Sequence, residues 1–149
     1  MKHAVLLFIH FSSAIFWVGG MAFAYFCLRP AAGSVLEPPQ RLALWAATFA
    51  RFFRYVAIAV VLLIGSGLWM ILRIGLSYAP HGWLAMMVLG LFMAGVFVFI
   101  YWRLYPRLVG HVSAGRWPDA AAALNDIRQL VALNLVLSVL TVAAAAFSR

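Results

Sequence analysis

Acidic side chains are scarce in this sequence, and charge of either sign is low. The 149 residues include three Asp and Glu against eleven Lys and Arg, and 9 % are charged, whereas soluble domains have about 25 %. No acid lies inside any long apolar stretch, and the sequence has no nucleophile elbow, no HExxH motif and no glycine-rich nucleotide loop. These absences argue against hydrolytic chemistry. An enzyme with this sequence would need a redox cofactor.

Cysteine is nearly absent as well. Cys27 is the single one, which excludes an internal disulfide, and its predicted place near the inner end of the first span indicates a reduced thiol. A filler or lipid-facing role is favoured over metal binding.

Apolar residues, in contrast, make up 67 % of the chain. Four stretches, residues 3–27, 54–72, 82–105 and 128–147, are long enough to cross a hydrocarbon core of about 30 Å as helices. We interpret the first as a retained span rather than a signal peptide, because its apolar run is long and its basic region is one Lys. The sequence therefore predicts an all-α integral membrane protein, a four-transmembrane-helix bundle that forms one domain over residues 1–149.

Prolines are predicted to separate some spans from their connections. Arg29-Pro30 is expected to end the first span, because proline lacks a backbone donor and disfavours helix in the residue before it. Residues 106–117 are expected to be a connection, with His111 as a solvated loop residue. The lack of Gly and Pro in residues 40–64 favours one continuous helix into the second span, and Trp117-Pro118-Asp119 favours another into the fourth. Both are expected to extend into the cytoplasm.

Basic residues are distributed unevenly around the spans. Lys2, Arg73 and Arg149 lie on one side, and all three acids lie on the other. Because cytoplasmic loops carry the excess of Lys and Arg, both termini and the second connection are predicted to be periplasmic, in a bacterial inner membrane. The net charge of +8 does not indicate nucleic-acid binding, since the basic residues flank spans and form no patch on a soluble face. Eight of them surround the first and third connections: Arg29, Arg41, Arg51, Arg54, Arg103, Arg107, Arg116 and Arg128.

One ionisable side chain, His10, lies about two turns inside the first span. Such a group is costly in a bilayer and usually faces the protein interior, which makes it a candidate functional residue. At 100° per residue His10 shares a helical face with Ser13, Ala14 and Trp17. That face is expected to point into the bundle.

Further histidines and methionines are candidate partners of His10. His81 opens the third span and His3 lies near the N-terminus, both on the outer side, while Met87 is expected at a depth similar to that of His10 and Met86 on an adjoining face. Imidazole nitrogen with thioether sulfur suits copper, above all Cu(I), and haem iron accepts His/His or His/Met pairs between facing helices. The alternative is that the histidines only hydrogen-bond across the bundle and the methionines fill space.

Small and polar residues indicate helix contacts. Gly65-Ser66-Gly67, near the outer end of the second span, is interpreted as a place of close packing or a kink rather than a binding loop. Asn134 is expected to point inward and hydrogen-bond across the bundle, because an unpaired amide is costly in lipid.

Several short motifs, in order along the chain, resemble the small bacterial CopD-type membrane proteins (copper resistance protein D-like), which are named for copper resistance and uptake. This resemblance implies copper handling. The motifs are His10 followed by Ala14, Trp17-Val18-Gly19-Gly20, Arg29-Pro30, Arg51-Phe52 and Ser66-Gly67.

A more distant resemblance is to the membrane protoporphyrinogen oxidase of the HemJ type, which is associated with haem b. It rests on the His-to-Trp-Gly pattern that begins at His10 and on Gly82-Trp83 before the third span. That family carries a helix-1 His, which maps onto His10, and a functional Lys soon after its Gly-Trp, where this chain has Met86-Met87. The resemblance implies haem binding through His10 with His81 or a Met.

Three functions are therefore compatible with these residues. The leading hypothesis is a CopD-like protein that binds or transports copper through His10, His81 and Met87 near the periplasmic face, with His3 and Met86 as further candidate ligands. The second is a b-type haem protein, in electron transfer or porphyrin oxidation, with His10 as axial ligand. The third is a structural membrane subunit without a cofactor. Expected partners are the lipid bilayer, a second copy of the chain, and a periplasmic copper donor or redox partner.

Overall fold

Four long helical segments make up the computed structural model, which describes residues 2–147. The predicted orientation also depends on Lys2 and Arg149. Arg149 and the side chain of Lys2 lie outside the described part. The segments His3–Val35, Pro38–Ile74, His81–Ser113 and Trp117–Ala146 are each long and apolar enough to cross a membrane. No strand occurs within residues 2–147. The predicted all-α fold with four transmembrane helices is confirmed.

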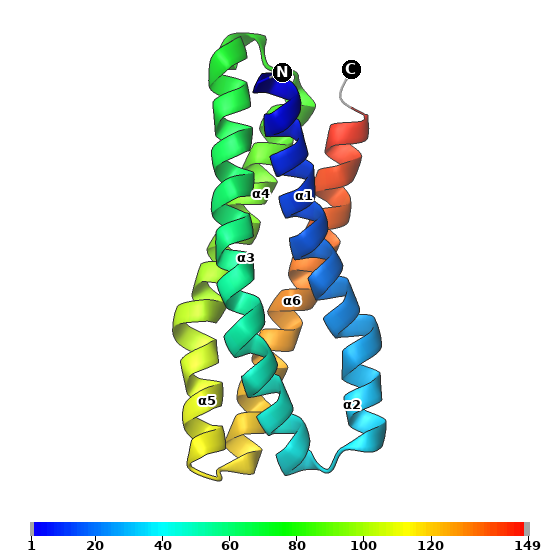
Figure 1. Ribbon diagram of the computed structural model, residues 1–149, viewed down its shortest axis with the longest axis vertical. Coiled ribbons are helices and arrows are strands. Elements are labelled where there is room, and N and C mark those ends of the chain that lie inside the picture. The colour runs from blue at the N-terminus through cyan, green and yellow to red at the C-terminus, as the bar shows by residue number, and fades with distance from the viewer. Residues whose placement is uncertain (1, 148–149) are drawn as a thin grey trace.

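The helices alternate in direction along the bundle (Figure 1). The first segment comprises α1 (Lys2–Phe23), the π-helical turn η1 (Ala24–Leu28) and α2 (Arg29–Val35), and the second is α3 (Pro38–Ile74). A 3-10 turn, η2 (Leu76–Tyr78), leads to α4 (His81–Phe99), the π-helical turn η3 (Ile100–Leu104), α5 (Tyr105–Ser113) and finally α6 (Trp117–Ala146). Both chain ends and the connection after α3 lie at one end of the bundle, which we call the terminal end (Figure 1). The connections 36–37 and 114–116 lie at the opposite end, which we call the arginine end.

Pro30 and Pro106 do not end helices, contrary to the prediction. The first span continues to Val35 and the third to Ser113, so the connections at the arginine end shrink to two and three residues. His111, predicted in a loop, lies in the last turn of α5.

A π-helical turn before each proline explains why the helix continues. In η1 the Arg29 N–H bonds to the Ala24 carbonyl, five residues earlier, and in η3 the Tyr105 N–H bonds to the Ile100 carbonyl. Proline in a regular helix clashes with the carbonyl four residues before it, and the wider turn relieves that clash. Proline composition alone does not reveal such a turn, so the sequence predicted two breaks that do not exist.

The long helices α3 and α6 are continuous, as predicted. They contain 37 and 30 residues, and α3 at 1.5 Å per residue measures about 55 Å, which exceeds the apolar thickness of a bilayer. α3 begins at a capping box in which the Glu37 side chain accepts from the Gln40 N–H and the Gln40 Oε1 accepts from the Glu37 N–H. It ends at Gly75, whose φ of 92° is a conformation open to glycine. The side of the membrane toward which these helices extend stays a prediction.

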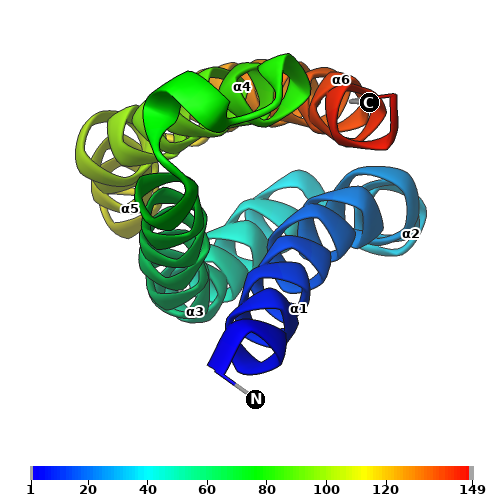
Figure 2. The same ribbon diagram turned by 90° about the horizontal axis from the view of Figure 1, so that it is seen from above.

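Aromatic packing forms the centre of the bundle. The rings of Phe49 and Phe53 stack with their centroids 4.7 Å apart, and Phe97 meets both Phe53 and Trp17 edge-on. These contacts join α3, α4 and α1, while α6 packs chiefly against α4 and α5. Seen along its long axis, the bundle forms an open arc with α2 at one tip and α6 at the other (Figure 2).

Polar and small residues support the helix contacts that the sequence predicted. Asn134 is 1 % exposed, and its Nδ2 donates to the Met93 carbonyl of α4 over 3.2 Å, which links α6 to α4. Ser66 and Gly67 are buried on α3, in line with close packing, whereas Gly65 is exposed. The predicted inward position of Asn134 is confirmed.

Candidate functional site

His10 is joined to α3 by a hydrogen bond. Its Nδ1 lies 3.0 Å from the Ser66 Oγ, and that oxygen lies 2.6 Å from the Leu62 carbonyl of its own helix. A serine hydroxyl has one proton to donate, and the shorter contact with Leu62 receives it. We therefore assign Nδ1 as the protonated ring nitrogen that donates to Ser66. Nε2 then carries the free lone pair, which is the form of imidazole that coordinates metals.

Gly67 lets His10 and Met87 approach the same point on α3. A Cβ atom added at Gly67 would lie 3.1 Å from the His10 Cε1 and 3.5 Å from the Met87 Cε. Alanine at this position would crowd the His10 ring by a few tenths of an ångström and would make an ordinary van der Waals contact with Met87. The structure thus brings together an imidazole from α1 and a thioether from α4, at the similar depth that the sequence predicted.

The other predicted ligands differ from this pair in position and exposure. His81 is the exposed first residue of α4, His3 is exposed in the first turn of α1, and Met86 is partly buried next to Met87 in the sequence. Within residues 2–147 no group of three or more His, Cys, Asp or Glu side chains is arranged to hold a metal ion. His10, His81 and His3 therefore form no histidine cluster in the described chain.

Carboxylates are confined to the arginine half of the described chain. Glu37 precedes α3, Asp119 lies in the first turn of α6, and Asp126 lies two turns further along the same helix. The half of the bundle that contains His10 and Met87 thus offers neutral nitrogen and sulfur donors without an Asp or Glu beside them.

A second feature, which the sequence did not predict, is a cleft of about 790 Å³ between the first segment and α6. Its deep part is apolar and aromatic, and its wall includes Trp17, Met21 and Phe53. Three arginines, Arg29, Arg41 and Arg128, line its part nearest the arginine end. We call it the arginine cleft. In the sequence analysis these arginines served only to predict the orientation, although Arg128 is the first residue of an apolar span rather than part of a connection.

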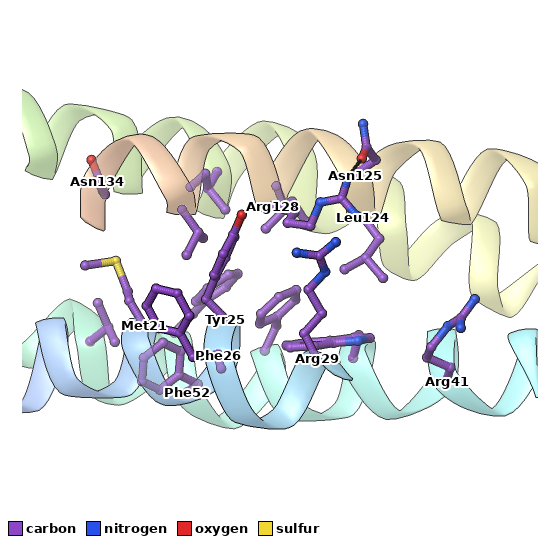
Figure 3. Close-up of a pocket in the computed structure, with 18 of the residues that line it drawn as sticks. Met21, Tyr25, Phe26, Arg29, Arg41, Phe52, Leu124, Asn125, Arg128 and Asn134 are labelled. Carbon is purple, nitrogen blue, oxygen red and sulfur yellow. Dashed lines mark hydrogen bonds between the residues drawn. The ribbon is translucent and has the colours of Figure 1, made fainter. Parts of the chain in front are cut away.

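Arg29 and Arg128 extend into the arginine cleft from opposite walls (Figure 3). The Arg29 guanidinium carbon lies 5.3 Å from the centroid of the Tyr25 ring, and Arg128 donates through Nη2 to the Asn125 Oδ1. The one ion pair formed among residues 2–147 joins Arg116 to Asp119, so the arginines of the cleft have no carboxylate partner within the described chain.

The residues present do not fit a haem held by His10. The arginine cleft has the volume of a cofactor site, yet no histidine lines it. His10 lies instead against Ser66 and Gly67 at the contact of α1 with α3, where a Cβ on Gly67 would lie 3.1 Å from the His10 Cε1. The candidate axial histidine and the cleft with the volume of a cofactor site thus lie in different parts of the bundle.

The chain is similar to a known protein family. Residues 46–148 match the family model of CopD, copper resistance protein D. The chain belongs to the CopD family. The resemblance read from the short motifs is confirmed, and with its four apolar helices this CopD-family chain is a multi-pass membrane protein of the copper-resistance type. No curated protein and no solved structure matches the chain. The likeness to the HemJ type stays a prediction.

The CopD match covers part of the candidate site. Ser66, Gly67 and Met87 lie inside the matched residues, whereas His10 lies on α1, before them. The family assignment therefore supports copper handling in general and gives no role to His10.

Proposed function

We propose that this CopD-family protein binds or transports copper through a site formed by His10 and Met87 near the periplasmic face of a bacterial inner membrane. The observation that supports this most is the approach of both side chains to one point above Gly67, from two different helices. The two side chains come from different helices and carry the imidazole and thioether donors that Cu(I) prefers.

The hydrogen bond to Ser66 supports a ligand role for His10. Metal-binding histidines as a rule donate their second ring N–H to a neighbouring acceptor, which fixes the ring and raises the basicity of the coordinating nitrogen. Ser66 Oγ is such an acceptor, since its own proton is engaged by Leu62. Nε2 of His10 is then the coordinating atom.

The electrostatics of this half of the bundle favour a monovalent ion. Neutral donors compensate none of the charge of a bound cation, and the cost of a buried charge rises steeply with its magnitude. Cu(I) carries one charge and prefers thioether and imidazole ligands, whereas the carboxylates, which suit hard divalent ions such as Mg²⁺ and Ca²⁺, lie at the arginine end.

A site with two protein ligands suits passage of the ion. Conduction requires binding that is favourable enough for entry and weak enough for release. In this proposal a periplasmic donor delivers copper at the terminal end, where the exposed His81 and His3 supply transient ligands. Four spans are few for a complete path, so a second copy of the chain completes it.

Copper binding to purified variants tests the proposal. The protein, loaded with Cu(I) under reducing conditions and desalted, is expected to retain stoichiometric copper by elemental analysis. His10→Ala should lose it, and Met87→Leu, which conserves volume, should lower the affinity at least tenfold. Met86→Leu is the matched control on the same helical turn and should bind as the unaltered protein does.

Two results would overturn the proposal. Unchanged copper binding by His10→Ala would remove His10 as a ligand, and a protein that binds no copper would favour a structural subunit. A Soret band in the purified protein after expression with ample haem would instead support the haem hypothesis.

The proposed orientation is tested separately. A reporter enzyme that is active only in the periplasm, fused after Arg149, should be active, because eight basic residues lie toward the opposite side. Activity of a cytoplasm-dependent reporter at the same position would reverse the orientation and place the site at the cytoplasmic face.

A further inference from the structure

The arginine cleft has an apolar part and a basic part, which correspond to the acyl chain and the phosphate of an anionic membrane lipid. Its deep part, from Trp17 to Phe53, is apolar, and its outer part carries three guanidinium groups. We propose that this cleft binds one anionic phospholipid, with an acyl chain in the apolar part and the phosphate on Arg29 and Arg128.

The cleft is accessible from the side of the bundle. Phe26 and Pro30 belong to its wall and are exposed, and α2 stands apart from α6 at the arginine end (Figures 1 and 2). A volume of about 790 Å³ lies within the range of about 300 to 1,000 Å³ that is typical of small-molecule sites. One acyl chain can therefore enter from the bilayer while the second stays in the surrounding lipid.

The charges at the mouth select an anion. Arg29 and Arg128 reach in from α2 and α6, and the Arg41 Nη1 lies 3.9 Å from where a Cβ would lie on Gly33, which brings a third guanidinium from α3 beside α2. None of the three has a carboxylate within ion-pair distance in residues 2–147. Guanidinium groups bind phosphate through paired hydrogen bonds, and basic pockets between membrane helices are recognised sites for anionic headgroups.

The bond between Arg128 and Asn125 strengthens this assignment. The Asn125 Oδ1 accepts from Nη2 and holds the guanidinium over the cleft, which leaves its other donors free for a ligand (Figure 3). Arg29 lies against the Tyr25 ring, which fixes its direction in the same way. Both cations are thus oriented before a phosphate arrives.

A bound lipid would join the two tips of the open arc. The acyl chain would fill the space that the protein leaves between the first segment and α6, and the phosphate would neutralise their facing arginines. The site is separate from His10 and Met87, so it does not depend on the proposed copper function.

Lipid titration of the detergent-purified full chain tests the inference. Native mass spectrometry should detect one tightly bound phosphatidylglycerol, with at least tenfold preference over phosphatidylcholine of the same chain length, and phosphatidylglycerol should raise the unfolding temperature. In Arg29→Gln/Arg128→Gln the affinity for phosphatidylglycerol should fall about 30-fold, since each arginine near an anionic headgroup contributes about a factor of five.

Arg51→Gln/Arg54→Gln is the matched control. Both residues are exposed on α3 and do not line the cleft, so loss of two charges there should change the affinity less than twofold. Ala121→Trp is a second variant, which leaves the charge unchanged. Ala121 is exposed on α6 and lines the cleft, so the indole should compete with the lipid and lower the affinity for phosphatidylglycerol. In phosphatidylcholine the unfolding temperature of this variant should equal that of the unaltered protein.

Three outcomes would overturn the inference. An equal loss of affinity for phosphatidylglycerol in the two double variants would show that net charge, and not the cleft, explains the binding. Equal stabilisation by inorganic phosphate and by phosphatidylglycerol would show an anion site without an acyl chain. A dimer that dissociates in Arg29→Gln/Arg128→Gln, with no lipid retained, would assign the cleft to a second copy of the chain.

Discussion

Replacing Ser66 with alanine separates the hydrogen bond of His10 from every other contribution to the candidate site. Ser66 is 5 % exposed, and its Oγ accepts from the His10 Nδ1 over 3.0 Å while it donates to Leu62. Alanine removes this acceptor from the half-buried His10 ring. Loss of one such hydrogen bond costs about 0.5 to 1.5 kcal/mol in the free energy of unfolding. Loss of the group that orients a metal-binding histidine lowers metal affinity about 10- to 100-fold.

Ser138 supplies a matched control for this change. It is 3 % exposed on α6, and its Oγ donates to the Leu135 carbonyl of the same helix over 2.7 Å. Ser138→Ala therefore removes a buried hydroxyl and one bond to the helix backbone, as Ser66→Ala does, without touching a histidine. The difference between the two variants isolates the bond to His10.

The assay combines two measurements on the same samples. Cu(I) affinity is measured by competition with a chromophoric chelator, and stability is measured by unfolding in detergent. Ser66→Ala should lose at least ten times more affinity than Ser138→Ala and should be less stable by about 0.5 to 1.5 kcal/mol. If the two variants bind copper equally and unfold together, the hydrogen bond neither orients His10 nor matters to the site, and the assigned tautomer is wrong.

Two further predictions concern the helices that carry the sites. Asn134→Leu should cost about 0.5 to 2 kcal/mol in unfolding free energy, since it removes one interhelical bond to Met93, and unchanged stability in thermal unfolding would contradict a contribution of that bond. Gly75→Ala should destabilise the protein by about 1 to 3 kcal/mol, because φ is 92° at this position. Gly95→Ala is the control and should be neutral or stabilising by up to about 1 kcal/mol, since a Cβ at that helical position meets nothing within 4 Å. Equal stability of the two variants in thermal unfolding would contradict the backbone argument.

The spans and the meeting of two candidate ligands follow from simple properties of the sequence. An uninterrupted apolar run has to form a helix in lipid, and the absence of Gly and Pro from residues 40–64 made the continuity of α3 predictable. His10 and Met87 lie at comparable distances from the ends of their spans, and a fixed rise per residue brings them to one level. His81 shares the terminal end, but it is the first residue of α4, directly after Pro80, where the helical phase does not fix the direction of a side chain, and it is exposed.

The arginine cleft depends on distances between helices, which the sequence does not contain. Arg29 and Arg128 lie near opposite ends of the chain, and the charge pattern that explains them as topology signals is complete without any contact between them. Their common cleft exists because α2 packs on α3 and leaves α6 free on that side. Because the charge pattern is fully explained by membrane topology, it gives no sign that Arg29 and Arg128 share a cleft.

The π-helical turn η1 also changes the helical phase of everything that follows it. A π turn accommodates one residue more than an α turn, and each α-helical residue advances the side-chain direction by about 100°, so a wheel drawn from His10 is rotated by roughly that angle beyond Leu28. The direction in which Arg29 points is therefore set by the extra residue in η1. Because the wider turn absorbs one extra residue, deletion of one residue between Ala24 and Leu28 would restore a regular helix and leave Arg29 facing the cleft, at the cost of returning Pro30 to a regular helical turn.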